Sequence, residues 1–149
     1  MNQLNLFDFE TNLLNSFEPA VCWSSTDPNR TIYLHGYVIN RRGIIKNTKT
    51  GKILRGRTGE TKVFKAGQRY ISVRFVVHKK MYDLLLHRVV ACTFIKCIDR
   101  ETYTIVNHID HDKKNNHYAN LEWCSPSENM EAWADQHFNL SDENQLKLL

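Results

Sequence analysis

The chain of 149 residues carries a formal net charge of +4 and is 42% hydrophobic, which is enough to bury one core with a small appendage. No apolar run approaches the ~20 residues that a membrane helix requires. The N-terminal sequence MNQLNLFDFE is acidic where a signal peptide would be basic. We therefore expect a soluble protein that is not exported and has no membrane partner.

The charge is distributed unevenly along the chain. Residues 1–30 carry a net charge of −3, residues 31–90 carry +12 and residues 91–149 carry −5. A basic block between acidic ends suits a polyanionic partner, and its charge exceeds what solubility requires. The charge alone favours a nucleic-acid partner, and the alternative is a solvated lysine-rich surface.

Residues 1–30 show little periodicity, and we assign them no function. Within them NLLNSF favours a short helix and DPN at 27–29 favours a turn. We describe this segment as an N-terminal extension of unknown role.

The basic block has the pattern of antiparallel strands. In YVINRRGIIKNTKTGKILRG, short β-branched runs are separated by RRG and NTKTGK, which supply glycine where a turn needs positive φ. In RYISVRFVV one face presents Ile71, Val73, Phe75 and Val77, and Tyr70 and Arg74 lie on the other. The pattern predicts an antiparallel meander over about 32–86, and LLLHRVVACTFI then predicts a helix.

Four cysteines form neither a CxxC pair nor a spacing typical of zinc sites: Cys22, Cys92, Cys97 and Cys124. We expect buried free thiols, because cysteine packs as a small hydrophobe. The alternative is a structural zinc module that uses Cys97, Cys124 and histidines, but the spacing argues against it.

A capped helix is predicted from about residue 126. In SPSE, Ser125 can cap the helix, Pro126 suits its first position, and Glu128 can bond back to the amide of the cap. One stripe of this helix should pack against the strand that contains Leu121 and Trp123, and its members are Met130, Trp133, Ala134 and His137. We expect both Trp123 and Trp133 in the core.

The segment before this helix predicts a ββα unit. Residues 103–106 form a β-branched run, HDKKNN is rich in turn formers, and LEWC is a second short strand. A hairpin of this kind would place Asn107 and His108 beside Asn129 at the start of the helix. Phosphodiester hydrolysis needs such groups, because imidazole serves as a base near neutral pH and oxygen atoms hold a hard divalent cation.

The spaced set N-H-x-D, NN and N-L-x-W, preceded by His87-Arg88, resembles the phage-type HNH endonucleases with a ββα-metal fold, including homing endonucleases. The resemblance is densest over 86–129, and the upstream β segment is similar to the small module that often precedes it. It implies an α+β protein in which an antiparallel β meander is followed by a ββα-metal motif. The domains expected are an N-terminal extension, a basic DNA-binding module, an HNH nuclease domain and a C-terminal tail, at 1–30, 31–85, 86–140 and 141–149.

The resemblance implies roles for individual residues. His108 would be the general base, Asn107 and Asn129 would hold one Mg²⁺ or Mn²⁺ ion, and Asn120 would brace the loop and orient the histidine. His87 and Trp123 would be structural members of the motif, and we do not expect zinc. Asn115 and Asn116 are predicted turn formers, and His111 and His117 are expected to face solvent.

Two positions depart from the family pattern. His111 occupies a position where the family usually has glycine, so a side chain must tolerate positive φ there. Asn107 replaces the usual aspartate, which predicts weak metal binding without DNA and leaves room for help from Asp110.

The interpretation is a metal-dependent endonuclease of double-stranded DNA, of the nicking or homing type. We expect a monomer in the cytoplasm, that of the host cell if a phage encodes it. The alternative is a non-catalytic DNA-binding protein that retains the HNH scaffold. The basic residues expected to contact DNA are Arg41, Arg42, Lys46, Lys49, Lys52, Arg55, Arg57, Arg69 and Arg74.

Overall fold

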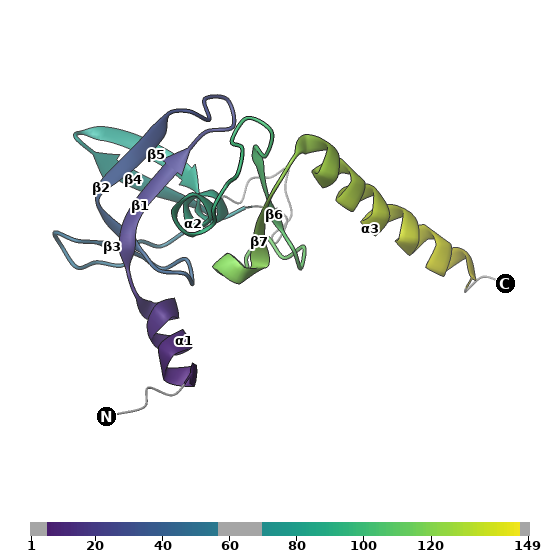
Figure 1. The fold of residues 1–149 in the computed structure, drawn as a ribbon, viewed down its shortest axis with the longest axis horizontal. Coiled ribbons are helices and arrows are strands. Elements are labelled where there is room, and N and C mark those ends of the chain that lie inside the picture. Colours follow the sequence, from purple (N-terminus) through teal and green to yellow (C-terminus); the bar gives the residue numbers. More distant parts are fainter. Residues whose placement is uncertain (1–5, 57–69, 147–149) are drawn as a thin grey trace, which may run out of the picture.

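The computed structural model describes residues 6–56 and 70–146, and it has the expected α+β architecture with antiparallel strand pairs (Figure 1). The elements in chain order are α1 (Leu6–Asn15), β1 (Glu18–Trp23), β2 (Thr31–Ile39), β3 (Ile45–Asn47), β4 (Ser72–Val77), β5 (Lys80–Leu85), α2 (Leu86–Phe94), β6 (Ile105–His108), the 3₁₀ turn η1 (Tyr118–Asn120), β7 (Leu121–Cys124) and α3 (Pro126–Leu146). No helix among these residues is long and apolar enough to cross a membrane.

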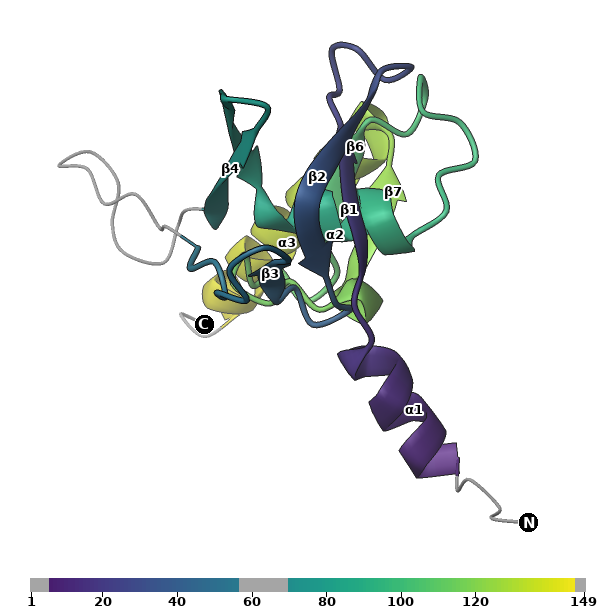
Figure 2. The ribbon, with the colours of Figure 1, turned by 90° about the vertical axis from the view of Figure 1, so that its left-hand side faces the viewer.

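The strands of the basic block form two separate sheets instead of one meander. β1, β2 and β3 make a three-stranded antiparallel sheet, and β4 and β5 pair only with each other. Figure 2 shows the β4–β5 hairpin standing apart from the larger sheet. Its two-residue turn, His78 and Lys79, has φ values of 49° and 64°, which matches the tight hairpin turns that twisted strands favour.

The turn residues act as their sequence predicts. Between β2 and β3 the buried Asn40 side chain accepts hydrogen bonds from the amides of Arg42 and Ile44, and Gly43 adopts a φ of 81°. At the end of β3, the side-chain oxygen of Asn47 accepts hydrogen bonds from the amides of Lys49 and Thr50, and Gly51 adopts a φ of 70°.

Strand β1, at residues 18–23 of the N-terminal segment, belongs to the folded body, which corrects the domain boundary expected at residue 30. β1 pairs with β2 in antiparallel register, and it buries Ala20, Cys22 and Trp23 in the core. The boundary was misplaced because β1 carries proline and a register irregularity between Pro19 and Val21, which hide the strand alternation. The helix expected near NLLNSF is present as part of α1.

One continuous hydrophobic core joins the predicted β module to the predicted nuclease segment. The central helix α2 buries Leu86, Val89, Val90 and Ala91 among residues from all three sheets. Phe75 on β4 is completely buried, and its strand alternates as predicted from RYISVRFVV. The two parts are therefore built around shared packing.

Helix α3 begins where the capping box predicts. The Ser125 amide donates to the Glu128 carboxylate at 2.7 Å, and the Glu128 amide donates to the Ser125 hydroxyl at 3.2 Å. The stripe expected to pack against β7 does not do so, because α3 projects from the body (Figure 1) and leaves Met130 71% exposed and Trp133 57% exposed. The helix also continues past the tail boundary expected at 141, and the side chain of His137 lies outside the described residues.

Trp123 contacts the core as expected. Its ring stacks on that of Trp23 with centroids 5.3 Å apart, and its indole N–H donates to the Ile95 carbonyl. The guanidinium of Arg88 lies over the same ring and also bonds the carbonyls of Trp23 and Thr104. These contacts link β1, α2 and β7 directly behind the ββα unit.

Candidate active site

His108 ends strand β6 and is buried, with 4% of its surface exposed. Its partner across the hairpin is Leu121, the first residue of β7. The Nε2 atom lies 3.0 Å from Oδ1 of Asn116, which is also buried. A buried imidazole with one polar partner is held in one orientation.

The Asn116 amide determines which ring nitrogen of His108 carries the proton in the neutral form. Its Nδ2 atom donates to the Lys114 carbonyl, so Oδ1 is the end that faces His108. A carbonyl oxygen can only accept, so Nε2 carries the proton and Nδ1 is the basic nitrogen of the neutral ring. Asn116 was expected to be only a turn former, whereas its side chain directly contacts the histidine.

The side chain of Asn120 braces the loop after His108. Its side-chain oxygen accepts from the Asp110 amide, and its Nδ2 donates to the Asp110 carboxylate and to the Asn115 carbonyl. The bracing matches the expectation, but the direct bond to His108 comes from Asn116. Asn120 therefore acts on the histidine only through the loop.

Asp110 organises the same loop. Hydrogen bonds from Asn115, from the Asp112 amide and from Asn120 hold the pKa of its carboxyl below the ordinary value. These bonds occupy both carboxylate oxygens, which makes Asp110 a brace of the loop. His111 follows with a φ of 62°, the positive value predicted for a position where glycine is usual.

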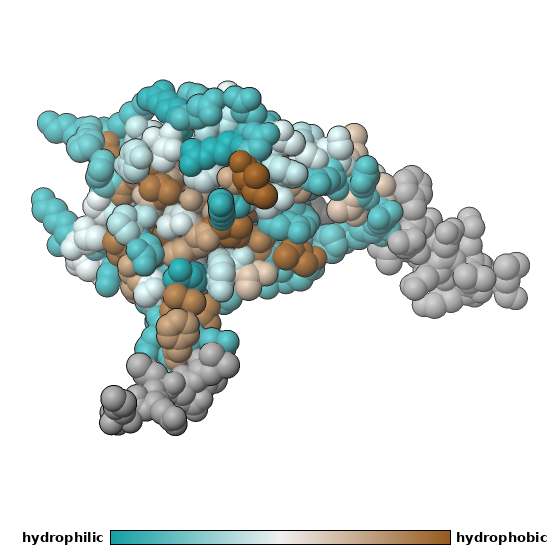
Figure 3. Space-filling view, viewed as in Figure 1, coloured by the Kyte–Doolittle hydropathy of each residue, from teal (hydrophilic) through white to brown (hydrophobic). Residues whose placement is uncertain are grey.

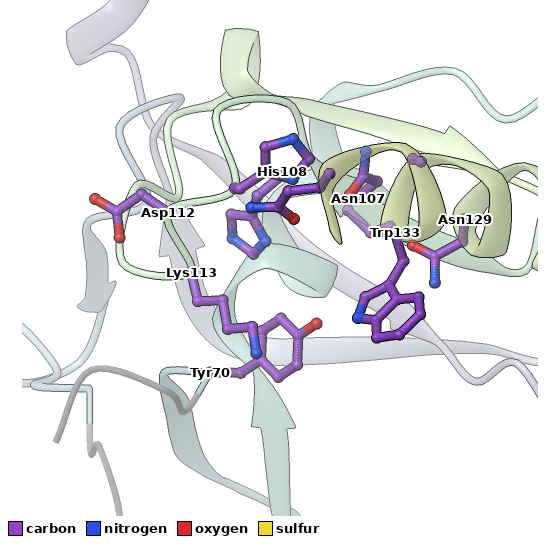
Figure 4. Close-up of a pocket in the computed structure, with 11 residues that line it drawn as sticks. Tyr70, Asn107, His108, Asp112, Lys113, Asn129 and Trp133 are labelled. Carbon is purple, nitrogen blue, oxygen red and sulfur yellow. The ribbon is translucent and has the colours of Figure 1, made fainter. Parts of the chain in front are cut away.

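A cavity of about 430 Å³ opens between the β6 end, this loop and the start of α3. Figure 4 shows Asn107, His108 and Asn129 around it, with Trp133 beside Asn129 on the same helix and Tyr70 and Lys113 nearby. The structure thus brings together the three residues that the ββα arrangement predicts. Tyr70 and Lys113 come from separate segments and were not predicted to meet there, and Trp133 was expected in the core.

The two asparagines come to the cavity from different elements. Asn107 lies on β6 opposite Glu122 on β7, and its Nδ2 donates to the Glu122 carboxylate at 3.0 Å. Asn129 lies in the first turn of α3, where the capping box fixes the helix start. Each asparagine therefore reaches the cavity from a well-supported backbone.

His87 lies behind His108 and is buried on α2. The two imidazole centroids are 4.9 Å apart, and the Tyr70 ring is 4.7 Å from His87 and 5.8 Å from His108. Burial, followed by the nearby His108 and Arg88, lowers the pKa of His87 to about 3. A neutral imidazole on α2 therefore packs against the ring of His108.

A comparison with known protein families identifies the same segment. Residues 99–131 match the HNH endonuclease family model. This part of the chain belongs to the HNH endonuclease family. The match includes β6, the loop, η1, β7 and the first turn of α3, and so contains Asn107, His108, Asn120 and Asn129.

Relatives and a solved structure extend the HNH likeness beyond that segment. Two uncharacterized HNH endonucleases of Acanthamoeba polyphaga mimivirus are 33% and 35% identical over 96 and 106 residues. These matches cover 64% and 68% of this chain, which spans about a quarter of those proteins, at 26% and 24%.

The HNH homing endonuclease I-HmuI, in a structure described as DNA binding and cleavage, matches with a TM-score of 0.60 and 24% identity. The match covers 75% of this chain and 60% of that chain. It shows that the two proteins share the fold.

The donor set of the HNH motif fits a hard divalent cation. Asn107 and Asn129 both line one cavity, and Mg²⁺ or Mn²⁺ accepts amide oxygens together with waters and phosphate oxygens. In the described ranges 6–56 and 70–146 no three His, Cys, Asp or Glu side chains gather as a zinc site would require. Three of the cysteines are buried free thiols, as predicted, and Cys97 is half-buried.

The basic residues expected at the DNA fall into three groups. Arg41 bonds the Leu13 carbonyl and lies over the Phe94 ring, Arg74 pairs with Asp83 at 2.8 Å, and the Lys46 ammonium lies over Phe17. These partners give them structural contacts that the charge pattern did not reveal. Arg57 and Arg69 lie outside the described residues. Arg42, Lys49, Lys52 and Arg55 are exposed, and Arg74 is exposed as well as paired.

Hydrophilic side chains project from the left-hand end of the molecule in Figure 3, where the β4–β5 hairpin and the loop after β3 lie. The hairpin turn adds His78 and Lys79, and Lys80 follows as the first residue of β5; all three are exposed. These residues belong to the basic block, but none of them was named among the predicted DNA contacts. Their position at the end of the hairpin explains their exposure.

Proposed function

We propose that the chain is a divalent-metal-dependent endonuclease that hydrolyses phosphodiester bonds of double-stranded DNA, with His108 as general base. One observation supports this most strongly. A buried imidazole, held at Nε2 by Asn116, shares a cavity with two asparagines from β6 and α3. This combination of a fixed base and two oxygen donors is suited to phosphodiester hydrolysis.

In the proposed reaction, Nδ1 of His108 takes a proton from water as the water oxygen forms a bond to phosphorus. The bond from phosphorus to the 3′ oxygen breaks, and solvent protonates that oxygen. Asn107 and Asn129 would hold the cation, which when bound neutralises the phosphate oxygens and the leaving oxygen. Asn120 would keep the loop in place, and His87 would support the ring of His108 from behind.

The basic surface around β2 and β3 would bind the duplex, and the HNH motif would cut it. Exposed cations after β2 and around β3 favour this assignment because phosphate contacts dominate the affinity of proteins for DNA. A monomer with one site predicts nicking of one strand. The homing type is proposed on the likeness to I-HmuI.

Supercoiled plasmid incubated with the protein and Mg²⁺ or Mn²⁺ tests the proposal. We expect open circles that require the metal, are abolished by EDTA, and are absent with His108→Ala. Plasmid that is shifted in a gel but uncut under all divalent ions, with several target sequences supplied, would contradict catalysis. That result would instead support the non-catalytic DNA-binding protein.

A further inference from the structure

Glu122 contacts the site from outside the cavity. It is exposed on β7, directly opposite Asn107 on β6, and it is not among the residues that line the cavity. Its carboxylate accepts the Nδ2 hydrogen of Asn107 at 3.0 Å. Residues directly opposite in an antiparallel pair point to the same face, so the strand register itself brings these two side chains together.

This hydrogen bond determines which end of the Asn107 amide is available. The Nδ2 end is engaged by Glu122, which leaves Oδ1 as the end that can serve a cation. A carboxylate acceptor also draws positive charge toward Nδ2 and thereby increases the negative charge on Oδ1. Glu122 therefore orients the amide and makes its oxygen a stronger donor.

We propose that Glu122 is a positioning residue that supplies, through Asn107, the negative charge that an amide ligand lacks. The inference rests on the proposed metal-dependent function. Asn107 alone gives the cation a neutral donor, and the carboxylate that would balance its charge lies one hydrogen bond further out. No other carboxylate in the described part of the chain bonds to Asn107 or Asn129.

The test measures Mn²⁺ affinity by electron paramagnetic resonance on the full chain, bound to a phosphorothioate duplex that is hydrolysed slowly. Glu122→Gln keeps an oxygen acceptor but removes the charge, and Glu122→Ala removes both. Glu131→Gln is the matched control, because it removes the same charge from an exposed carboxylate near the first turn of α3. Far-UV circular dichroism verifies that each variant is folded.

We expect Glu122→Ala to weaken Mn²⁺ binding about tenfold, the lower end of the effect of removing a partner of a metal ligand. Glu122→Gln should have an intermediate effect, and Glu131→Gln should bind as the wild type does. Equal affinity of the wild type and both Glu122 variants would overturn the role of Glu122. Equal losses in Glu122→Gln and Glu131→Gln would also overturn it, because net charge alone would then explain the effect.

A second comparison separates polarisation from simple support of the hairpin. In an Asn107→Asp background, Glu122 would face another carboxylate, so Glu122→Gln should preserve or improve Mn²⁺ affinity. An equal loss from Glu122→Gln in both backgrounds would contradict the proposal. Absence of saturable Mn²⁺ binding in the wild-type complex would overturn the proposed function itself, a result distinct from binding that Glu122 does not influence.

Discussion

We predict that the hydrogen bond between Asn116 and His108 contributes a measurable part of the cleavage rate. Asn116→Ala removes a 3.0 Å bond between two buried groups and leaves Nε2 of His108 without that partner. Losing one partner of a buried pair costs about 1–3 kcal/mol. If the bond stabilises the transition state by this full amount because it orients the ring, the cleavage rate of the variant should fall about 5- to 150-fold.

Single-turnover nicking of plasmid by saturating protein measures this rate without a contribution from product release. Asn115→Ala is the matched control, because it removes a side-chain bond to Asp110 in the same loop but does not touch His108. We expect Asn115→Ala to lower stability with a much smaller effect on the rate. Equal rates for Asn116→Ala and the wild type would refute the orienting role.

The variant Asn116→Asp tests the same contact through its pH dependence. A carboxylate beside Nε2 stabilises the imidazolium form, so the base stays protonated to higher pH. The acid limb of the pH–rate profile should therefore move to higher pH. An unshifted limb would show that residue 116 does not govern the protonation of the catalytic base.

The remaining predictions concern stability and DNA affinity. Because the pKa of His87 is lowered to about 3, the unfolded chain binds a proton there below pH 6.5 that the folded chain does not. Stability should therefore fall by roughly 3 kcal/mol between pH 7 and pH 4, and urea unfolding of His87→Gln should show a smaller fall. His111→Gly should raise the free energy of unfolding by about 1 kcal/mol because φ is 62°; a lower melting temperature would contradict this. For DNA binding, about six phosphate contacts predict a slope near −5 for log affinity against log salt. Lys49→Ala with Lys52→Ala should make that slope less steep by about 2, and an unchanged slope would exclude both lysines from the interface.

Local signals in the sequence predicted the elements that carry the site. The capping box placed the start of α3, turn formers separated β6 from β7, and the family spacing selected Asn107, His108 and Asn129. These features depend on residues close in sequence, so one chain is sufficient to find them. The positive φ of His111 was predicted for the same reason.

Long-range contacts could not be predicted in the same way. Asn116 was assigned to the turn because its type suits turns, and only the folded loop shows it bonded to His108. Trp133 was expected in the core because it is large and apolar, but α3 leaves the body before it can be covered. A hydrogen-bond partner of Arg41 lies on α1, and the partner of Arg74 lies on the opposite strand, β5. A count of charges along the chain carries no information about such contacts.

The most direct test of the central claim is the single-turnover cleavage rate of His108→Ala beside that of His35→Ala in Mg²⁺. His35 is an exposed histidine on β2, so its removal controls for the loss of an imidazole as such. If His108 is the general base, its loss should lower the rate about 10²- to 10⁴-fold, with His35→Ala close to the wild type. A folded His108→Ala protein that cuts DNA at the wild-type rate would contradict the account.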